Sequence, residues 1–377
     1  MERRAKQIFF SLLIIGLPLF KLSGYKNFFA RIPQLWLLVS GGMFLFALCQ
    51  KNVWIKLFLI HCLGTAIYLD HLNFRMNVLL GLVSLCVCVF LISLVQEMNT
   101  DLLKVVVFIS SYLVLYFWII KEFRMGSQVE KAWIGGAYLA FAIPLVLTIT
   151  DDFKFAILGT MPLLLGCLYT KSTTAIVAAY SGVVLVFIYK KHYLALLILC
   201  ALSLVGAYFF LPKTFREFPF RNEVWTESYK YKKASKIFRQ KVHFYKFTAG
   251  LEEEQIYVKE KDRRRTGLDR LIGTGLRSYR EYEFLEGKDE RGGILITHPH
   301  NSFLECYCEL GIVGLLIVVF FLVELFTVVC PIEYKAMLLA IVVHCSGYYA
   351  DKLAMTGLLI IICIGTIESY RIKNNNV

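Results

Sequence analysis

Long apolar runs dominate the chain, and they constrain its fold more than any other feature. A hydrocarbon core about 30 Å thick needs about 20 mostly apolar residues per helix. Only 18% of the 377 residues are charged, against about 25% in soluble domains. We therefore predict an all-α polytopic membrane protein with about 12 transmembrane helices. The candidate spans are 7–22, 33–49, 53–69, 77–95, 102–120, 132–150, 153–170, 173–189, 193–211, 306–330, 334–350 and 354–370.

One stretch, residues 212–301, contains no apolar run long enough to cross a membrane. It holds 20 of the 41 Lys and Arg and 14 of the 28 Asp and Glu, which leaves a net charge of +6 out of +13 for the chain. Within it, residues 228–247 predict a basic amphipathic helix with aromatic side chains, and residues 251–261 predict a second helix. The organisation we expect is transmembrane helices over 1–211, a mostly helical loop domain over 212–301, and transmembrane helices with a short cytoplasmic tail over 302–377.

Lys and Arg in the short loops indicate the orientation of such a chain. With the N-terminus in the cytoplasm, twelve of them lie inside and nine outside, a weak bias. Both termini are then cytoplasmic, and the 212–301 domain lies outside, where long segments translocate regardless of charge. On that side, a basic aromatic stretch suits anionic lipid or a phosphorylated saccharide better than nucleic acid.

Cysteine usage and motif content indicate no metal and no cofactor. None of the eleven cysteines lies in the 212–301 domain, and all fall in or beside apolar runs, where they act as small hydrophobic residues. The pairs Cys86/Cys88 and Cys306/Cys308 have the wrong spacing for zinc. The chain also has no phosphate-binding Gly-Lys loop and no dinucleotide-binding fingerprint.

The residues that suggest chemistry gather between positions 268 and 314. They are a glycine turn, two arginines and a His-Pro-His-Asn stretch before an apolar run, namely Gly273, Gly275, Arg277, Arg280 and His298–Asn301. Asn301 or Ser302 can cap the helix that follows, and a helix N-terminus favours an anion. Arginine binds phosphate through its planar fork, and the pKa of histidine lies near neutrality. Together these residues predict a site for a phosphate-bearing ligand with a titratable base beside it.

This region resembles a known family. His300-Asn301, nine residues and Gly311-Ile-Val-Gly314 are similar to the His-Asn-x9-Gly-x-x-Gly signature of bacterial O-antigen ligases, within a superfamily of O-antigen ligases and polymerases. The preceding Gly-x-Gly-Leu-x-Ser-Tyr turn, Gly273–Tyr279, is typical of the superfamily. The number of spans and the single large loop late in the chain match its architecture as well.

The resemblance implies a GT-C-type membrane glycosyltransferase of the bacterial inner membrane with a periplasmic active site. Such ligases transfer a glycan from undecaprenyl pyrophosphate to a sugar hydroxyl of lipid A–core oligosaccharide, with inversion and without metal or ATP. The family's histidine corresponds to His300, its preceding arginine to Arg277, and an aspartate of its last outer loop to Asp351. Many members carry a Thr/Ser-Arg pair at the eighth span; here the stretch is Tyr169–Thr174, without arginine, and Lys171 supplies the nearest charge.

Each remaining candidate has a structural alternative. His298 acts beside His300 or orients it. Arg280 and Arg265 bind phosphate or remain solvated, whereas Arg216 and Arg221 bind phosphate or anchor the chain at the interface. Asp351 has an ion pair with Lys352 as its alternative. The full set of candidate substrate-binding residues is Arg277, Arg280, Arg265, Lys171, Arg216, Arg221, Asn301 and Asp351.

Two other functional classes stay open. An O-antigen polymerase uses the same donor but a second lipid-linked glycan as acceptor. A lipid-glycan flippase or transporter fits the number of spans, although the internal repeats common in transporters are not evident.

Two further histidines, His61 and His344, lie within predicted spans. An ionisable side chain at membrane depth suggests function. For both we instead expect a neutral imidazole that is hydrogen-bonded to a neighbouring helix.

Overall fold

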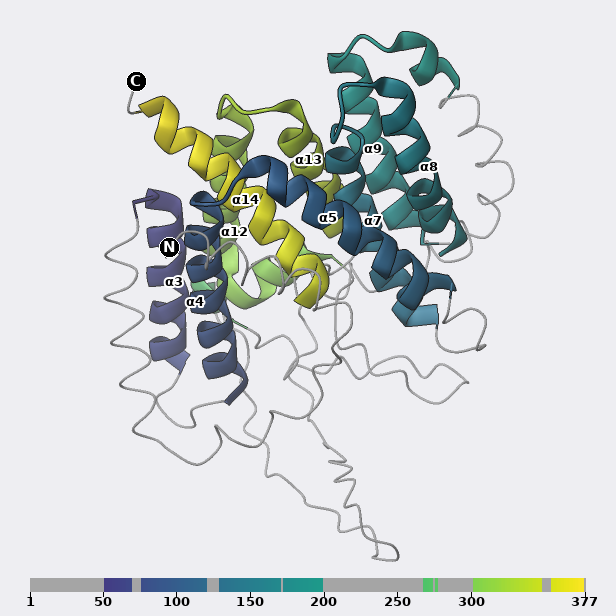
Figure 1. Cartoon of the computed structure of the whole chain (residues 1–377). Helices are drawn as coiled ribbons and strands as arrows, with labels where there is room; N and C mark the ends of the chain where they lie inside the picture. Colours follow the sequence, from purple (N-terminus) through teal and green to yellow (C-terminus); the bar gives the residue numbers. More distant parts are fainter. Residues whose placement is uncertain are drawn as a thin grey trace, which may run out of the picture.

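The computed structural model describes residues 51–69, 76–120, 129–170, 172–198, 267–273, 275–276, 301–347 and 354–375. Within these ranges the chain forms helices and no strand (Figure 1). The predicted spans 7–22 and 33–49 lie outside the described residues, as do most of the 212–301 domain and its amphipathic segment 228–247. The all-α prediction is therefore confirmed for the described part of the chain.

The described helices follow the apolar runs closely. Helices α3 and α9 begin and end where the sequence predicts, and every helix except α11 overlaps a predicted span. The bounds are α3 Val53–Leu69, α4 Met76–Gln96, α5 Thr100–Val114 with the π-helical continuation η3 Leu115–Ile120, α7 Val129–Val146, α8 Phe153–Tyr169, α9 Thr173–Tyr189, α11 Gly267–Ile272, α12 Ser302–Thr327, α13 Ile332–Gly347 and α14 Ala354–Asn375.

Most helix ends lie within a few residues of the prediction, and the two largest extensions, at the start of α12 and the end of α14, occur where polar residues make capping or ionic contacts. Helix α12 begins at Ser302 rather than at residue 306, since Asn301 caps it. Helix α14 continues past residue 370, where Arg371 pairs with Glu324 at 2.8 Å and with Glu368 at 2.6 Å. Hydropathy alone ends a span at its polar residues, so it misses both extensions.

Two described helices are long and apolar enough to cross a membrane, Thr100–Phe117 and Ser302–Thr327. Five further apolar helical segments in the described part are 10–17 residues long. Prolines fall inside α7 and α8, at Pro144 and Pro162.

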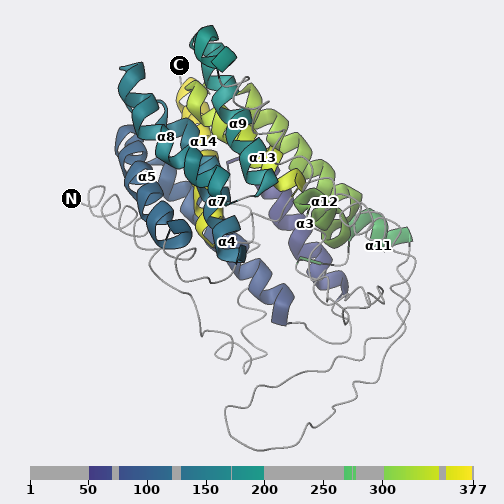
Figure 2. The same ribbon diagram turned by 90° about the vertical axis from the view of Figure 1, so that its right-hand side faces the viewer.

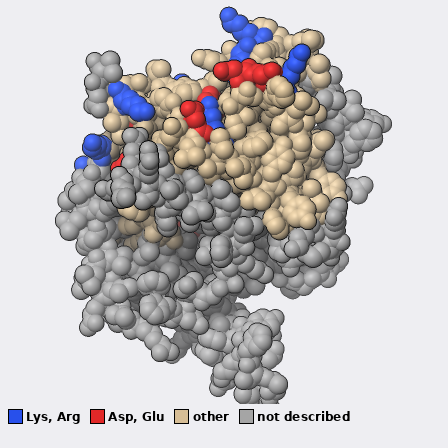
Figure 3. Space-filling model, in the orientation of Figure 1, with Lys and Arg blue, Asp and Glu red and all other residues tan. Residues whose placement is uncertain are grey.

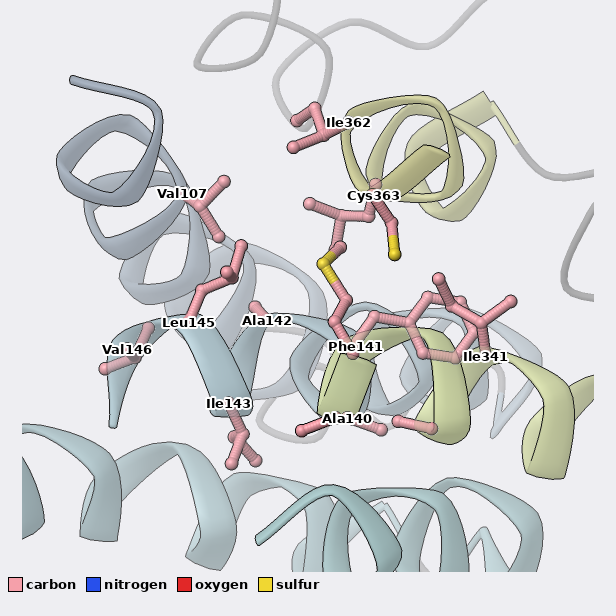
Figure 4. Packing of buried hydrophobic residues seen from close by; sticks show 14 of the residues in the cluster. Val107, Ala140, Phe141, Ala142, Ile143, Leu145, Val146, Ile341, Ile362 and Cys363 are labelled. Carbon is pink, nitrogen blue, oxygen red and sulfur yellow. The ribbon is translucent and has the colours of Figure 1, made fainter. Parts of the chain in front are cut away.

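The largest hydrophobic core surrounds α7. Figure 4 shows Val107 of α5, Leu145 of α7 and Ile341 of α13 in this cluster, with residues of α14 beside them. Small residues let α7, α9 and α13 approach closely, as in many helix pairs within membranes. A Cβ added to Gly182 of α9 would lie 2.7 Å from Pro144 Cγ and 3.2 Å from the Ala336 carbonyl oxygen.

A second, smaller core joins α3, α4 and α12. Its buried residues include Leu59 and Cys62 of α3, Leu82 of α4 and Leu310 of α12. Leu276, which follows the glycine turn, packs against the same cluster. The turn and the first part of α12 therefore share a core with α3, and α11 lies beside α12 (Figure 2).

Polar contacts tie together several helix ends on one side of the bundle. Lys104 at the start of α5 pairs with Glu333 at the start of α13 at 2.6 Å. Asn52, before α3, donates to Glu368 near the end of α14 at 2.9 Å. In Figure 3 the described charged residues gather toward the end where the C-terminus lies. The predicted alternation of helix direction places these same ends together.

Candidate functional site at the kink of α12

Asn301 is the one predicted site residue that the structure describes, and it caps α12. Its backbone is extended, with φ −157° and ψ 110°, and its Oδ1 accepts a hydrogen bond from the Leu304 N–H at 3.0 Å. The predicted cap is confirmed. Because an amide oxygen that caps a helix satisfies one of its free N–H groups, this contact fixes where α12 begins, two residues after His300 in the sequence.

Helix α12 is broken at Gly311. This residue has φ 66° and ψ −171°, a conformation that is essentially restricted to glycine. A break ends the regular pattern of i to i+4 hydrogen bonds, so carbonyl groups just before Gly311 need other donors. Two such donors come from segments distant in sequence.

The glycine turn supplies the first donor. The Gly275 N–H donates to the Glu309 carbonyl oxygen at 2.7 Å, and Gly273 and Gly275 have φ of 91° and 97°. A Cβ on Gly273 would lie only 2.2 Å from that carbonyl oxygen, and one on Gly311 only 2.4 Å from the Leu271 carbonyl oxygen. The two glycine elements therefore touch backbone to backbone, with no room for side chains.

His61 of α3 supplies the second donor. Its Nε2 lies 2.8 Å from the Leu310 carbonyl oxygen. Since a carbonyl oxygen only accepts, the imidazole Nε2–H donates. The expectation of a bond from His61 to a neighbouring helix is confirmed. His344 is buried, and its ring packs edge-on against Phe141. Its predicted hydrogen bond to a neighbouring helix stays a prediction.

Gly314 leaves space for His61. A Cβ at this position would lie 3.2 Å from His61 Nε2 and 2.3 Å from Leu310 Cβ. The two glycines of the Gly-x-x-Gly element thus have different roles. Gly311 adopts a backbone conformation closed to other residues, and Gly314 admits the imidazole ring to the Leu310 carbonyl.

Three acidic side chains are buried on α11 and α12: Asp269, Glu305 and Glu309. Glu305 and Glu309 are four residues apart and so lie on one face of α12. Glu305 also belongs to the first turn of α12, where the helix dipole favours negative charge. None of these carboxylates was among the predicted site residues. Glu309 did carry a signal, because it lies inside the predicted span 306–330 and a glutamate is costly at membrane depth.

A second contact brings the α8–α9 turn to the end of α13. Ser172 caps α9 through its hydroxyl, and Thr170 ends α8. A Cβ on Gly347 would lie 2.6 Å from Thr174 Cγ2. The α8–α9 stretch that was compared with the Thr/Ser-Arg pair of O-antigen ligases therefore contacts the last turn of α13.

The other predicted site residues lie outside the described part of the chain. They are His298, His300, Arg265, Arg277, Arg280, Arg216, Arg221, Lys171 and Asp351. Their roles stay predictions. Among the described residues no group of three His, Cys, Asp or Glu side chains is suited to a metal ion.

Comparison with known proteins finds no matching family model, no matching curated protein and no matching solved structure.

Proposed function

We propose that the chain is a membrane glycosyltransferase of the O-antigen ligase kind. Its donor is a glycan on undecaprenyl pyrophosphate, and its acceptor is a sugar hydroxyl of lipid A–core oligosaccharide. The proposed location is the bacterial inner membrane, with a polytopic chain and the site at the periplasmic face.

One observation carries the proposal. The two stretches that resemble the family, the glycine turn and the Gly-x-x-Gly element, are separated in sequence but contact each other through Gly273, Gly275 and Gly311. Asn301, from the same signature, begins the helix that contains the contact. A motif whose separate parts meet in one structural unit is better explained as a site than as a chance match of residues.

The surface of α8 supports the membrane setting. A row of large apolar side chains on this helix is exposed, which is unusual for a surface that faces water and ordinary for one that faces lipid. They are Phe155, Leu158, Met161, Leu165 and Tyr169.

In the proposed reaction the acceptor oxygen bonds to the anomeric carbon as the bond from that carbon to the pyrophosphate oxygen breaks. His300 takes the hydroxyl proton, and undecaprenyl pyrophosphate leaves with the bonding electrons. Arg277, helped by other basic side chains, stabilises the charge on the leaving group. Fixed donors of this kind contribute about 3 kcal/mol each in well-studied sites.

The test is transfer by the purified chain with lipid-linked glycan and lipid A–core, followed by mass spectrometry of the glycolipid product. We expect the parent to form the conjugate and His300→Ala to lose about 10²- to 10⁴-fold in rate, the usual contribution of a general base. His192→Ala is the matched control, because this histidine stacks on Phe153 at a ring-centroid distance of 3.8 Å, away from the kink.

Arg277→Gln with Arg270→Gln as control tests the leaving-group contact. Arg270 is exposed on α11, close in sequence to the glycine turn. A selective loss with Arg277→Gln supports the proposal, whereas full transfer by His300→Ala contradicts the mechanism. A product extended on a second lipid-linked glycan, with no core conjugate, would identify a polymerase instead.

A further inference from the structure

The break at Gly311 makes the direction of the first turns of α12 depend on contacts from outside the helix. A continuous helix fixes its own axis through its hydrogen bonds, but Gly311 interrupts them and has no Cβ to restrict rotation. The segment before the break begins directly after His300 and contains Glu305 and Glu309. A small rotation about Gly311 would therefore move Asn301 and the residues that directly precede it in the sequence.

Two hydrogen bonds at the break resist this rotation. The Gly275 N–H holds the Glu309 carbonyl from the glycine turn, and His61 Nε2–H holds the adjacent Leu310 carbonyl from α3. The first bond is made by backbone, whereas the second depends on one side chain. His61 also stands on a helix that shares a hydrophobic core with Leu310, so its position is itself fixed.

We infer that His61 is a positioning residue for glycan transfer. By holding the Leu310 carbonyl, it sets the direction in which α12 presents the His300-Asn301 motif to the substrates. It does not touch the substrates itself. The inference rests on the proposed function, since it assigns His61 a role in that reaction.

The role predicts a specific order among variants. His61→Gln keeps an N–H that can reach a carbonyl, whereas His61→Leu keeps apolar bulk but no donor. Asn52→Ala is the matched control, at the residue directly before the same helix. It removes a hydrogen bond from the start of α3 to Glu368 of α14, with a length of 2.9 Å in the parent, at the opposite end of the bundle.

Steady-state transfer separates positioning from binding. For His61→Leu we expect kcat to fall about 10- to 100-fold, because displacement of a reacting group by about 1 Å costs up to about 100-fold. KM for donor and acceptor should stay within about 2-fold of the parent, since no substrate contact is lost. His61→Gln should retain at least about a third of the parental kcat, and Asn52→Ala should match the parent.

Hydrogen exchange with mass spectrometry supplies a readout that does not depend on transfer. His61→Leu should increase amide exchange in peptides covering residues 267–276 and 301–314, and leave peptides of α9 and α13 unchanged. His61→Gln should show the parental pattern. Asn52→Ala should change exchange only near the start of α3 and the end of α14.

The outcomes separate the two proposals. Local exchange at the kink with a selective loss of kcat supports the role of His61. Parental transfer by His61→Leu, a loss confined to KM, or increased exchange throughout the chain overturns it. If the parent itself forms no conjugate while the exchange pattern is as expected, the proposed function fails. The kink contact then stands without a catalytic role.

Discussion

At the scale of single residues, three glycines set the close backbone contacts in the described part of the candidate site. Gly273, Gly311 and Gly314 each lie where a Cβ would come within 2.5 Å of another heavy atom. Gly273 and Gly311 also have positive φ. These positions explain in physical terms why a Gly-x-Gly turn and a Gly-x-x-Gly element occur in the same chain.

We predict that Gly311→Ala destabilises the protein. The backbone conformation at position 311 costs about 1–3 kcal/mol for residues other than glycine. The added Cβ would also meet the Leu271 carbonyl oxygen at 2.4 Å. A lower thermal unfolding midpoint in detergent, measured by tryptophan fluorescence, would verify this.

Gly64→Ala is the control for Gly311→Ala. Gly64 lies on α3 with no heavy atom within 4 Å of an added Cβ. Alanine in a helix interior stabilises by about 0.5–1 kcal/mol relative to glycine, so the midpoint should stay or rise. Equal losses from both variants would contradict a special role for Gly311.

The sequence predicted which residues matter in this region better than it predicted the contacts that those residues make. The cap at Asn301 and the turn at Gly273 and Gly275 follow from local residue preferences, and both are confirmed. Spacing alone does not reveal which glycine of Gly-x-x-Gly has positive φ. The partner of His61 was also beyond prediction, because a contact between residues 61 and 310 depends on tertiary packing.

At the scale of helices, apolar length predicted the position of every described helix except α11, but not which helices pack together. Helices α3 and α9 are apolar around their whole circumference, so no polar face marks the side that faces lipid. The close contact of α9 with α7 and α13 depends instead on the small size of a few residues. Gly182 is the clearest of these.

Gly182→Val should therefore loosen the α7–α9–α13 core. Branched methyl groups would be forced against Pro144 and the Ala336 carbonyl, and overpacking of this kind costs about 1–3 kcal/mol. The expected observation is a lower thermal midpoint. Gly159→Ala on α8 is the control, because its Cβ would meet only Phe108 Cε2, at an ordinary 3.5 Å. An unchanged thermal midpoint for Gly182→Val would show that the close packing of α7, α9 and α13 at Gly182 does not contribute to stability.

At the scale of the whole molecule, ion pairs join helices that are distant in sequence. Lys104 and Glu333 are 2.6 Å apart, with side chains 15% and 9% exposed. Arg371 holds Glu324 and Glu368 in the same region of the bundle. Removal of one partner from such a pair strands a charge in a poorly hydrated site, which costs more than removal of both.

Lys104→Met should consequently cost about 2 kcal/mol or more, and Lys104→Met combined with Glu333→Met should cost less than the single change. A thermal double-mutant cycle measures the coupling between them. Lys154→Met, at an exposed position of α8, should change stability by no more than about 0.5 kcal/mol. Strictly additive effects of Lys104→Met and Glu333→Met would show that the pair contributes nothing beyond its separate residues.

The kink in α12 also bears on the thickness of the bilayer that the chain prefers. Beyond Gly311, α12 continues only from Ile312 to Thr327; at 1.5 Å per residue this is a length of about 24 Å, against a hydrocarbon core of about 30 Å. In the proposed membrane setting, either the turns before Gly311 complete the span or the lipid beside the part after Gly311 thins locally to match it. With local thinning, the lipid-borne donor of the proposed reaction would meet the protein where the membrane is shallowest, and its pyrophosphate would need to move less far into the membrane to reach the first turns of α12.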